Sequence, residues 1–173
     1  MATMILQLTR RINGGAYSDI FRSEDKQRVF KLFISDNHRT NTCQSLKPDV
    51  ELIRRTFQSE CWAYGLAHQH SYLTKHVPAF YGTVPVVDII DSNGKSLSNQ
   101  YLLDFCYSLA FVHGPAEKLS AYLGTSAHVD ELARAFNEKG IRYFRDASVF
   151  NPNDGETFKV IDFAMEEFEV TSC

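Results

Sequence analysis

The pattern of apolar and polar residues predicts three short strands at the start of the chain. Apolar side chains recur at close spacing in residues 6–12, 16–22 and 27–33. The segments between these runs, Asn13-Gly14-Gly15 and residues 23–26, are rich in residues that are typical of turns. We therefore expect three antiparallel strands joined by tight turns.

A long amphipathic helix is expected after a polar loop at residues 35–49. Apolar residues stand at positions 50, 53, 57, 61 and 64, and these spacings of three and four place them on one face of a helix. The pattern predicts a helix that begins near residue 50 and ends near residue 68.

Two more strands are expected after this helix. Residues 79–90 and 100–105 are rich in β-formers and flank Asp91-Ser92-Asn93-Gly94. An Asn-Gly pair between two such runs is a strong hairpin signal, because both residues tolerate the positive φ that the turn requires. The first part of the chain is thus predicted to hold five strands and one helix.

Beyond Gly114-Pro115 the periodicity becomes helical. It is weak in residues 119–123 and clear in residues 129–136, and it ends near Gly140. A short apolar run at residues 157–163 predicts one further strand. The predicted fold class is α+β, with a five-stranded antiparallel sheet and one helix followed by a smaller, mainly helical part.

Composition excludes some classes of partner. The 173 residues include 18 Lys and Arg against 21 Asp and Glu, which gives a formal net charge of −3 and argues against nucleic-acid binding. No apolar run reaches the roughly 20 residues of a membrane helix. The four cysteines are far apart, so neither a zinc site nor a disulfide framework is suggested. We expect a soluble protein of a reducing compartment such as the cytoplasm.

Lys31 is the most informative single residue. In Val29-Phe30-Lys31-Leu32-Phe33 the alternation of a strand makes both faces apolar. A lysine in such a strand either extends its ammonium group to the edge of the sheet or holds a fixed anionic partner, because an unpaired buried charge is unfavourable. Both interpretations remain open for Lys31 alone.

A turn of small residues precedes this strand. It runs through Asn13, Gly14, Gly15, Ala16, Tyr17 and Ser18. Backbone N–H groups of such a turn can approach phosphate oxygens closely, because little side-chain bulk intervenes. A plain hairpin is the alternative interpretation.

Three oxygen-bearing side chains lie near the end of the chain. Asp146 and Asn151 fall in one loop, and Asp162 ends the strand predicted at residues 157–163. Mg²⁺ prefers such hard oxygen ligands and takes the rest from substrate phosphates. Ordinary turn chemistry would also place Asp and Asn in loops.

Taken together and in order, these motifs resemble those of the protein-kinase superfamily. The likeness runs from about residue 6 to residue 163 and includes a helix glutamate, Glu60. The matching segments are residues 13–21 for the Gly-rich loop, Val29-Phe30-Lys31 for the strand lysine, Phe144-Arg145-Asp146 with Asn151 for the catalytic loop, and Asp162-Phe163-Ala164 for the D-F-G motif.

The resemblance implies a role for each matching residue. Lys31 would hold the ATP phosphates and pair with Glu60, with Glu51 as the weaker candidate for that pairing. Asp146 would orient the acceptor hydroxyl and take its proton. Asn151 and Asp162 would hold Mg²⁺. The adenine would lie against a hinge strand, with Leu103 behind it and the backbone of Asp104 and Cys106 at its edge.

The sequence also departs from the kinase pattern. Asn13 and Ser18 stand where glycines are usual, Ala164 replaces the glycine after Asp162-Phe163, and Phe144 replaces histidine. The resemblance implies an N-lobe at residues 1–106 and a truncated C-lobe at residues 107–173 without an activation segment. Such a form is similar to minimal effector kinases that some bacteria deliver into host cells. Helices that lose part of their apolar cover would present a face for an activating or target protein. The alternative is that apolar residues near the carboxyl end fold back and cover that face; these are Phe163, Met165, Phe168 and Val170.

Three functions are compatible with these residues. The first is an ATP- and Mg²⁺-dependent kinase that acts on a protein hydroxyl, serine or threonine in preference to tyrosine. The second is a pseudokinase that binds a partner without phosphoryl transfer. The third is a small-molecule kinase of the aminoglycoside or choline type, against which Arg145 argues because that type has a small residue before the catalytic aspartate.

Overall fold

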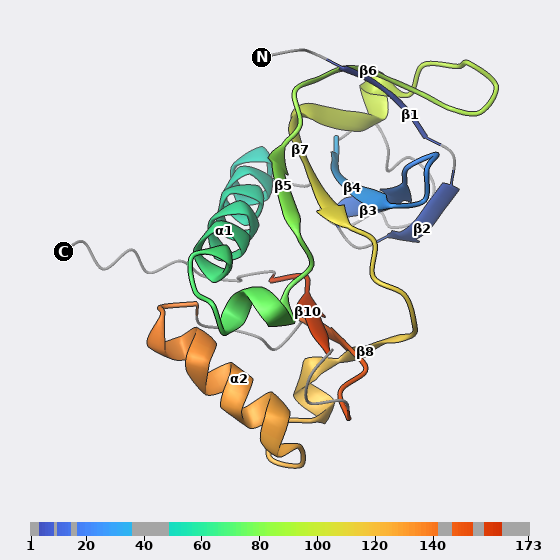
Figure 1. Ribbon diagram of the computed structural model, residues 1–173. Coiled ribbons are helices and arrows are strands. Elements are labelled where there is room, and N and C mark those ends of the chain that lie inside the picture. The colour runs from blue at the N-terminus through green and yellow to red at the C-terminus, as the bar shows by residue number, and fades with distance from the viewer. Residues whose placement is uncertain are drawn as a thin grey trace. The chain divides into compact units, whose positions relative to one another are not determined.

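The computed structural model describes residues 4–8, 10–14, 17–35, 49–141, 147–153 and 158–163. The chain divides into two compact units, one of residues 1–57 and 81–111 and one of residues 58–80 and 112–173 (Figure 1). The division differs from the expected boundary at residues 106 and 107. The reason lies in β7 (Tyr101–Ala110), which stays paired with β4 (Arg28–Ile34) as far as Ala110 and so keeps the whole strand in the first unit.

The first unit contains the five-stranded antiparallel sheet that the sequence predicts. Its strand order is β2-β3-β4-β7-β5. The strands not yet given are β2 (Arg10–Gly14), β3 (Ser18–Arg22) and β5 (Phe80–Thr83). β4 lies at the centre, with β3 on one side and β7 on the other. The α+β class and the five strands are thus confirmed.

Each face of this sheet is covered by apolar side chains. On one face, Leu32 and Cys106 are part of a buried cluster with Leu6 and Ile89. These last two come from a separate parallel pair, β1 (Met4–Gln7) and β6 (Val86–Ile90). On the other face, the ring of Phe33 packs edge-on against Phe57 of α1 (Val50–His68), with the ring centroids 5.8 Å apart.

The predicted strand at residues 6–12 is wrong as one element. The structure divides it into β1, which leaves the large sheet to pair with β6, and β2, which begins at Arg10. Burial explains the break, because Leu6 and Leu8 both face the apolar cluster, at 3% and 5% exposure. The turn predicted at residues 91–94 is present, with Gly94 at a φ of 77°, but it closes only an isolated bridge from Ile90 to Ser96.

The second unit combines a small antiparallel sheet with helices. The order β10-β9-β8 joins β8 (Ala116–Lys118), β9 (Ser148–Phe150) and β10 (Lys159–Ile161). The helices are the end of α1, η2 (Leu73–His76), η4 (Leu119–Ala121) and α2 (Ala127–Glu138). α2 agrees with the predicted helix, whereas residues 119–123 form only a short 3-10 turn. The strands β8 and β9 are not predicted from the sequence.

The apolar stripe of α2 is covered within the protein. Val129, Leu132 and Phe136 are each at most 1% exposed. Phe136 packs against Phe163, with ring centroids 5.3 Å apart. The expected docking face rested on loss of cover from residues 119–123 and 129–136. The stripe of α2 shows no such loss, whereas Leu123 is 41% exposed.

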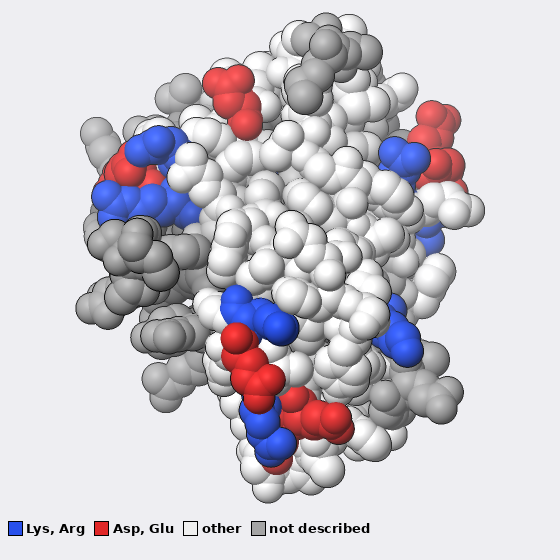
Figure 2. Space-filling view, turned by 60° about the vertical axis from the view of Figure 1, so that its left-hand side comes forward, with Lys and Arg blue, Asp and Glu red and all other residues white. Residues whose placement is uncertain are grey.

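The surface carries charges of both signs. On the face drawn in Figure 2, basic and acidic side chains stand in small mixed groups. One such group on α1 joins Glu51 to Arg54 at 2.6 Å and to Arg55 at 3.0 Å. Among the residues that the structure describes, no helix is both long enough and apolar enough to cross a membrane.

Candidate functional site

Lys31 lies at the centre of the large sheet and is only 7% exposed. Its register partners are Ile20 on β3 and Tyr107 on β7. The ammonium nitrogen is 5.6 Å from the centroid of the Phe33 ring. Burial of this kind favours a fixed anionic partner or ligand over an ammonium group extended into water.

The small-residue turn lies beside this strand. Gly14 at the end of β2 pairs with Asp19, and Ser18 at the start of β3 pairs with Phe33, two residues from Lys31. The carbonyl oxygen of Tyr17 accepts a 2.9 Å hydrogen bond from the N–H of Ile34. Gly15 and Ala16, and the side chain of Asn13, lie outside the described residues. The hairpin therefore places the turn and the lysine on adjacent strands of one sheet.

A buried polar network fixes this hairpin, and sequence reasoning missed it. The carboxylate of Asp19 is fully buried, accepts a 2.9 Å hydrogen bond from the Tyr101 hydroxyl and forms a 2.6 Å ion pair with Arg11. Burial and the negative charge of Asp19 raise the pKa of Tyr101 well above its ordinary value, so the phenol stays protonated and donates. No local signal could reveal a contact between residues 82 positions apart.

The hinge residues predicted from the sequence, Leu103, Asp104 and Cys106, lie in the middle of β7. Cys106 pairs there with Leu32, and its carbonyl oxygen accepts a 2.9 Å hydrogen bond from the N–H of Val84. Leu103 packs on the apolar cluster of the sheet, and Asp104 is exposed. The strand extends past the predicted hinge to Ala110, and the N–H of Phe111 still donates to the carbonyl oxygen of Gln27.

The two glutamates considered as partners of Lys31 have different environments. Glu60, on α1 in the second unit, is fully buried. Glu51 is partly exposed and accepts hydrogen bonds from Arg54 and Arg55, which lower the pKa of its carboxyl group. Glu51 is therefore engaged by surface arginines, whereas a fully buried carboxylate such as Glu60 requires a positive partner.

Asn151 and Asp162 each follow one strand of the β9–β10 pair. β9 and β10 are antiparallel, with Phe150 opposite Lys159 and Ser148 opposite Ile161. Asn151 follows β9 and Asp162 follows β10, so the two residues come directly after opposite ends of the pair. Their role as shared ligands of Mg²⁺ stays a prediction.

Asn151 and Asp162 share an unusual backbone conformation. Asn151 has a φ of 54° and Asp162 a φ of 66°, and Lys26 is the only other non-glycine residue of the described chain with a positive φ. Asp and Asn tolerate this left-handed conformation better than most residues, but it remains unfavourable. Such conformations cluster at functional sites, where the surrounding structure holds them in place.

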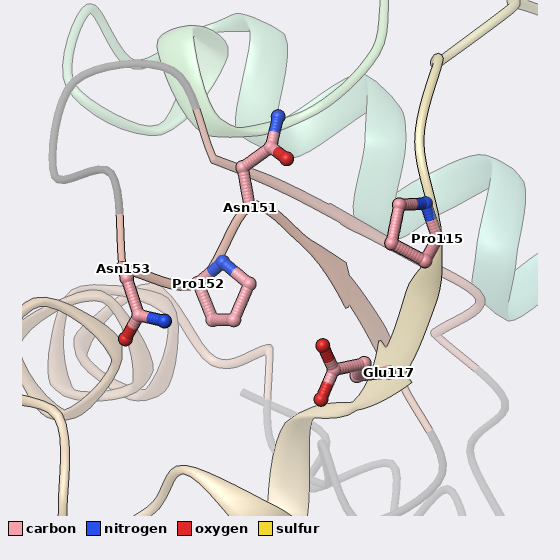
Figure 3. Close-up of a pocket in the computed structure, with 5 residues that line it drawn as sticks. All are labelled: Pro115, Glu117, Asn151, Pro152 and Asn153. Carbon is pink, nitrogen blue, oxygen red and sulfur yellow. The ribbon is translucent and has the colours of Figure 1, made fainter.

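Asn151 lines an open pocket of about 550 Å³ within the second unit, together with Pro115, Glu117, Pro152 and Asn153. In Figure 3 the carboxylate of Glu117 points from β8 toward the loop that carries Pro152 and Asn153. The Tyr122 hydroxyl donates a hydrogen bond to Glu117, which raises the pKa of that phenol. The lining offers hydrogen-bond acceptors and one negative charge, so it suits a hydroxyl or cationic group.

Asp162 is held by the aromatic core of the second unit. Its N–H donates a 3.2 Å hydrogen bond to the hydroxyl of Tyr64, which is fully buried. The next side chain, Phe163, is also fully buried and packs edge-on against Tyr64, with ring centroids 5.1 Å apart. Burial, followed by the charge of Glu60, raises the pKa of Tyr64 well above its ordinary value. The sequence placed Tyr64 in an apolar stripe but gave no sign of this contact.

Asp146 lies outside the described residues, and only its neighbour can be placed. Ala147 is buried, and its carbonyl oxygen accepts a 2.9 Å hydrogen bond from the N–H of Leu119. Ala147 precedes β9 at the end of the ribbon where Asp162 leaves β10. The described residues contain no group of three His, Cys, Asp or Glu side chains that could hold a metal ion. Mg²⁺ takes one or two protein oxygen ligands and completes its coordination with phosphates, and the side chains of Asp162 and Asn151 are oxygen donors of that kind.

Comparison with protein-family models, with curated proteins and with solved structures finds no match for this chain.

Proposed function

We propose that the protein is an ATP- and Mg²⁺-dependent phosphotransferase of the protein-kinase type, acting on a protein hydroxyl, serine or threonine in preference to tyrosine. The observation that carries the proposal is the buried Lys31 on the central strand, beside the hairpin of residues 13–18. A buried ammonium group next to a turn of small residues is suited to the phosphates of a nucleotide.

The assigned roles are those that the resemblance to kinase motifs implies. Lys31 and the N–H groups of the turn bind phosphate oxygens, and Glu60 supplies the carboxylate that orients Lys31. Asp146 orients the acceptor hydroxyl and accepts its proton. Asp162 binds the Mg²⁺ that accompanies ATP and neutralises charge on the transferred phosphoryl group. The kinase resemblance assigns the adenine edge to the backbone of β7 at Asp104 and Cys106, and Asp104 is the stronger candidate because the carbonyl oxygen of Cys106 already accepts from Val84.

A second candidate is a nucleotide-binding pseudokinase that performs no transfer. Asn13, Ser18 and Ala164 stand where the kinase pattern has glycines, which favours looser binding of the phosphates. Binding of ATP without turnover is the result that this second function predicts.

A transfer assay tests the proposal. The pure protein is incubated with γ-labelled ATP, Mg²⁺ and generic protein acceptors, and the Lys31→Ala and Asp146→Asn variants are compared with it. Lys95→Ala, in an exposed turn, is the matched control for removal of a lysine. Label on protein that is lost in the first two variants and kept in the control supports the proposal.

The other outcomes separate the alternatives. Nucleotide binding without transfer favours the pseudokinase. Label on choline or an aminoglycoside but not on protein identifies a small-molecule kinase. If the wild type and Asp146→Asn label protein equally, Asp146 is not the catalytic base, and the proposed mechanism is refuted.

A further inference from the structure

The segment that carries Asp162 is anchored at both ends by one stretch of the second unit, residues 58–80. At its start, the His76 ring nitrogen Nδ1 lies 3.2 Å from the carbonyl oxygen of Phe158, and the Lys159 ammonium group donates to the carbonyl oxygen of Lys75. At its end, the N–H of Asp162 donates to Tyr64. β10 is therefore held at both ends by side-chain to backbone hydrogen bonds.

The anchor at Asp162 differs in kind from the one at Phe158. Asp162 has a φ of 66°, a left-handed conformation that is unfavourable for a residue with a side chain unless its surroundings hold it. Its N–H donates a 3.2 Å hydrogen bond to the Tyr64 hydroxyl. Phe163 is clamped between Tyr64 and Phe136, with ring centroids 5.1 and 5.3 Å apart.

These contacts restrict the direction of the Asp162 side chain. The position of the Asp162 N–H and the position of the Phe163 ring together fix the backbone on both sides of the Asp162 Cα. The Cα–Cβ bond direction then follows from covalent geometry. Loss of the hydroxyl would remove one of the contacts that hold the backbone at this φ and favour return to an ordinary φ, which would turn the carboxylate.

We propose that Tyr64 is a positioning residue whose hydroxyl sets the direction of the Asp162 carboxylate and thereby the affinity of the protein for Mg²⁺ with a nucleotide. This inference rests on the proposed function and names a residue that the kinase-like motifs did not include. Tyr64 touches neither substrate nor metal in this account, and it acts only through the backbone of Asp162.

The test compares wild type, Tyr64→Phe and Tyr72→Phe in two measurements. Tyr72 lies in the same stretch of chain, is 38% exposed, and controls for removal of a phenol oxygen. The first measurement is binding of a fluorescent ATP analogue as a function of Mg²⁺ concentration. The second is hydrogen exchange of the Asp162 amide in the protein without ligand.

For Tyr64→Phe we expect the half-saturating Mg²⁺ concentration to rise about three- to ten-fold, the effect of one neutral hydrogen bond. Nucleotide binding without Mg²⁺ should be unchanged, the Asp162 amide should exchange faster, and Tyr72→Phe should match the wild type. Should Tyr64→Phe fail to fold, a ring-fluorinated tyrosine at position 64 weakens the acceptor while keeping the packing, and the same shift is expected.

Two results would overturn the inference, and they are distinguishable. If Tyr64→Phe has the same half-saturating Mg²⁺ concentration as the wild type, the hydroxyl does not set the affinity for Mg²⁺. The proposed function would remain intact. A wild-type protein that binds no nucleotide at any Mg²⁺ concentration refutes the proposed function and this inference with it.

Discussion

Replacement of Lys31 by methionine distinguishes the two interpretations of its burial. Methionine keeps an unbranched apolar stem of similar length and removes only the ammonium group. Lys31 is 7% exposed and lies on the central strand, so the replacement changes charge at a site from which water is largely excluded. An exposed lysine, Lys95, provides the matched Lys95→Met control.

The expected magnitude follows from the bonds that a buried ammonium group can make. Each hydrogen bond between charged groups contributes about 1.5–3 kcal/mol, and 1.4 kcal/mol is a tenfold change in affinity. Loss of one such bond to a phosphate should weaken ATP binding about ten- to hundred-fold and leave adenosine binding nearly unchanged. Removal of one member of a buried charge pair should also lower the free energy of unfolding, by about 3 kcal/mol or more.

The assay pairs isothermal titration with ATP and adenosine with urea unfolding of each variant. A lysine that merely extends its stem over apolar residues would behave in the opposite way. Lys31→Met would then bind ATP like the wild type and would be as stable or more stable, because an apolar group would replace a poorly solvated charge. That combination would refute the assignment of Lys31 to the phosphates.

Three further predictions concern stability. Tyr101→Phe removes the hydroxyl that donates to the buried Asp19 carboxylate and should cost about 1.5–3 kcal/mol in thermal unfolding, whereas a cost near zero would contradict the buried network. Burial lowers the pKa of His76, so the unfolded chain binds its proton first and stability should fall as pH drops below about 6.5; His76→Gln should flatten this slope in urea titrations at pH 7.5 and about 5.5. Phe163→Ala should cost about 3–5 kcal/mol, because its ring is fully buried between two others, and a much smaller loss would argue against that packing.

The elements that the sequence predicted correctly have strong local patterns. α1 has an apolar stripe over four turns. In the strands of the large sheet, apolar and polar residues alternate, and clear turn residues flank them. The errors arose where long-range packing decides the outcome. Residues 6–12 are continuous in pattern but break at Leu8, because burial against β6 requires β1 to leave the sheet. β8 and β9 have only three residues each, too few for any period to show.

The predictions for the candidate site succeeded and failed for the same reasons. Lys31 could be chosen from sequence because a lysine within an apolar strand is locally conspicuous, and the structure places it in a buried position. The ligand role of Asn151 was inferred from spacing along the chain, which could not show that Asn151 and Asp162 come after opposite ends of the β9–β10 pair. The contact of Tyr64 with Asp162 joins residues 98 positions apart, so no sequence window contains it.

The most direct test of the central claim is whether one nucleotide engages Gly14, Lys31 and Asp162. Isotope-labelled protein is titrated with a non-hydrolysable ATP analogue and Mg²⁺, and amide resonances are followed by NMR. We predict that the signals of these three residues shift together with a single apparent dissociation constant. Signals of Lys31 or Asp162 that stay unchanged at saturation would contradict the proposed phosphotransferase.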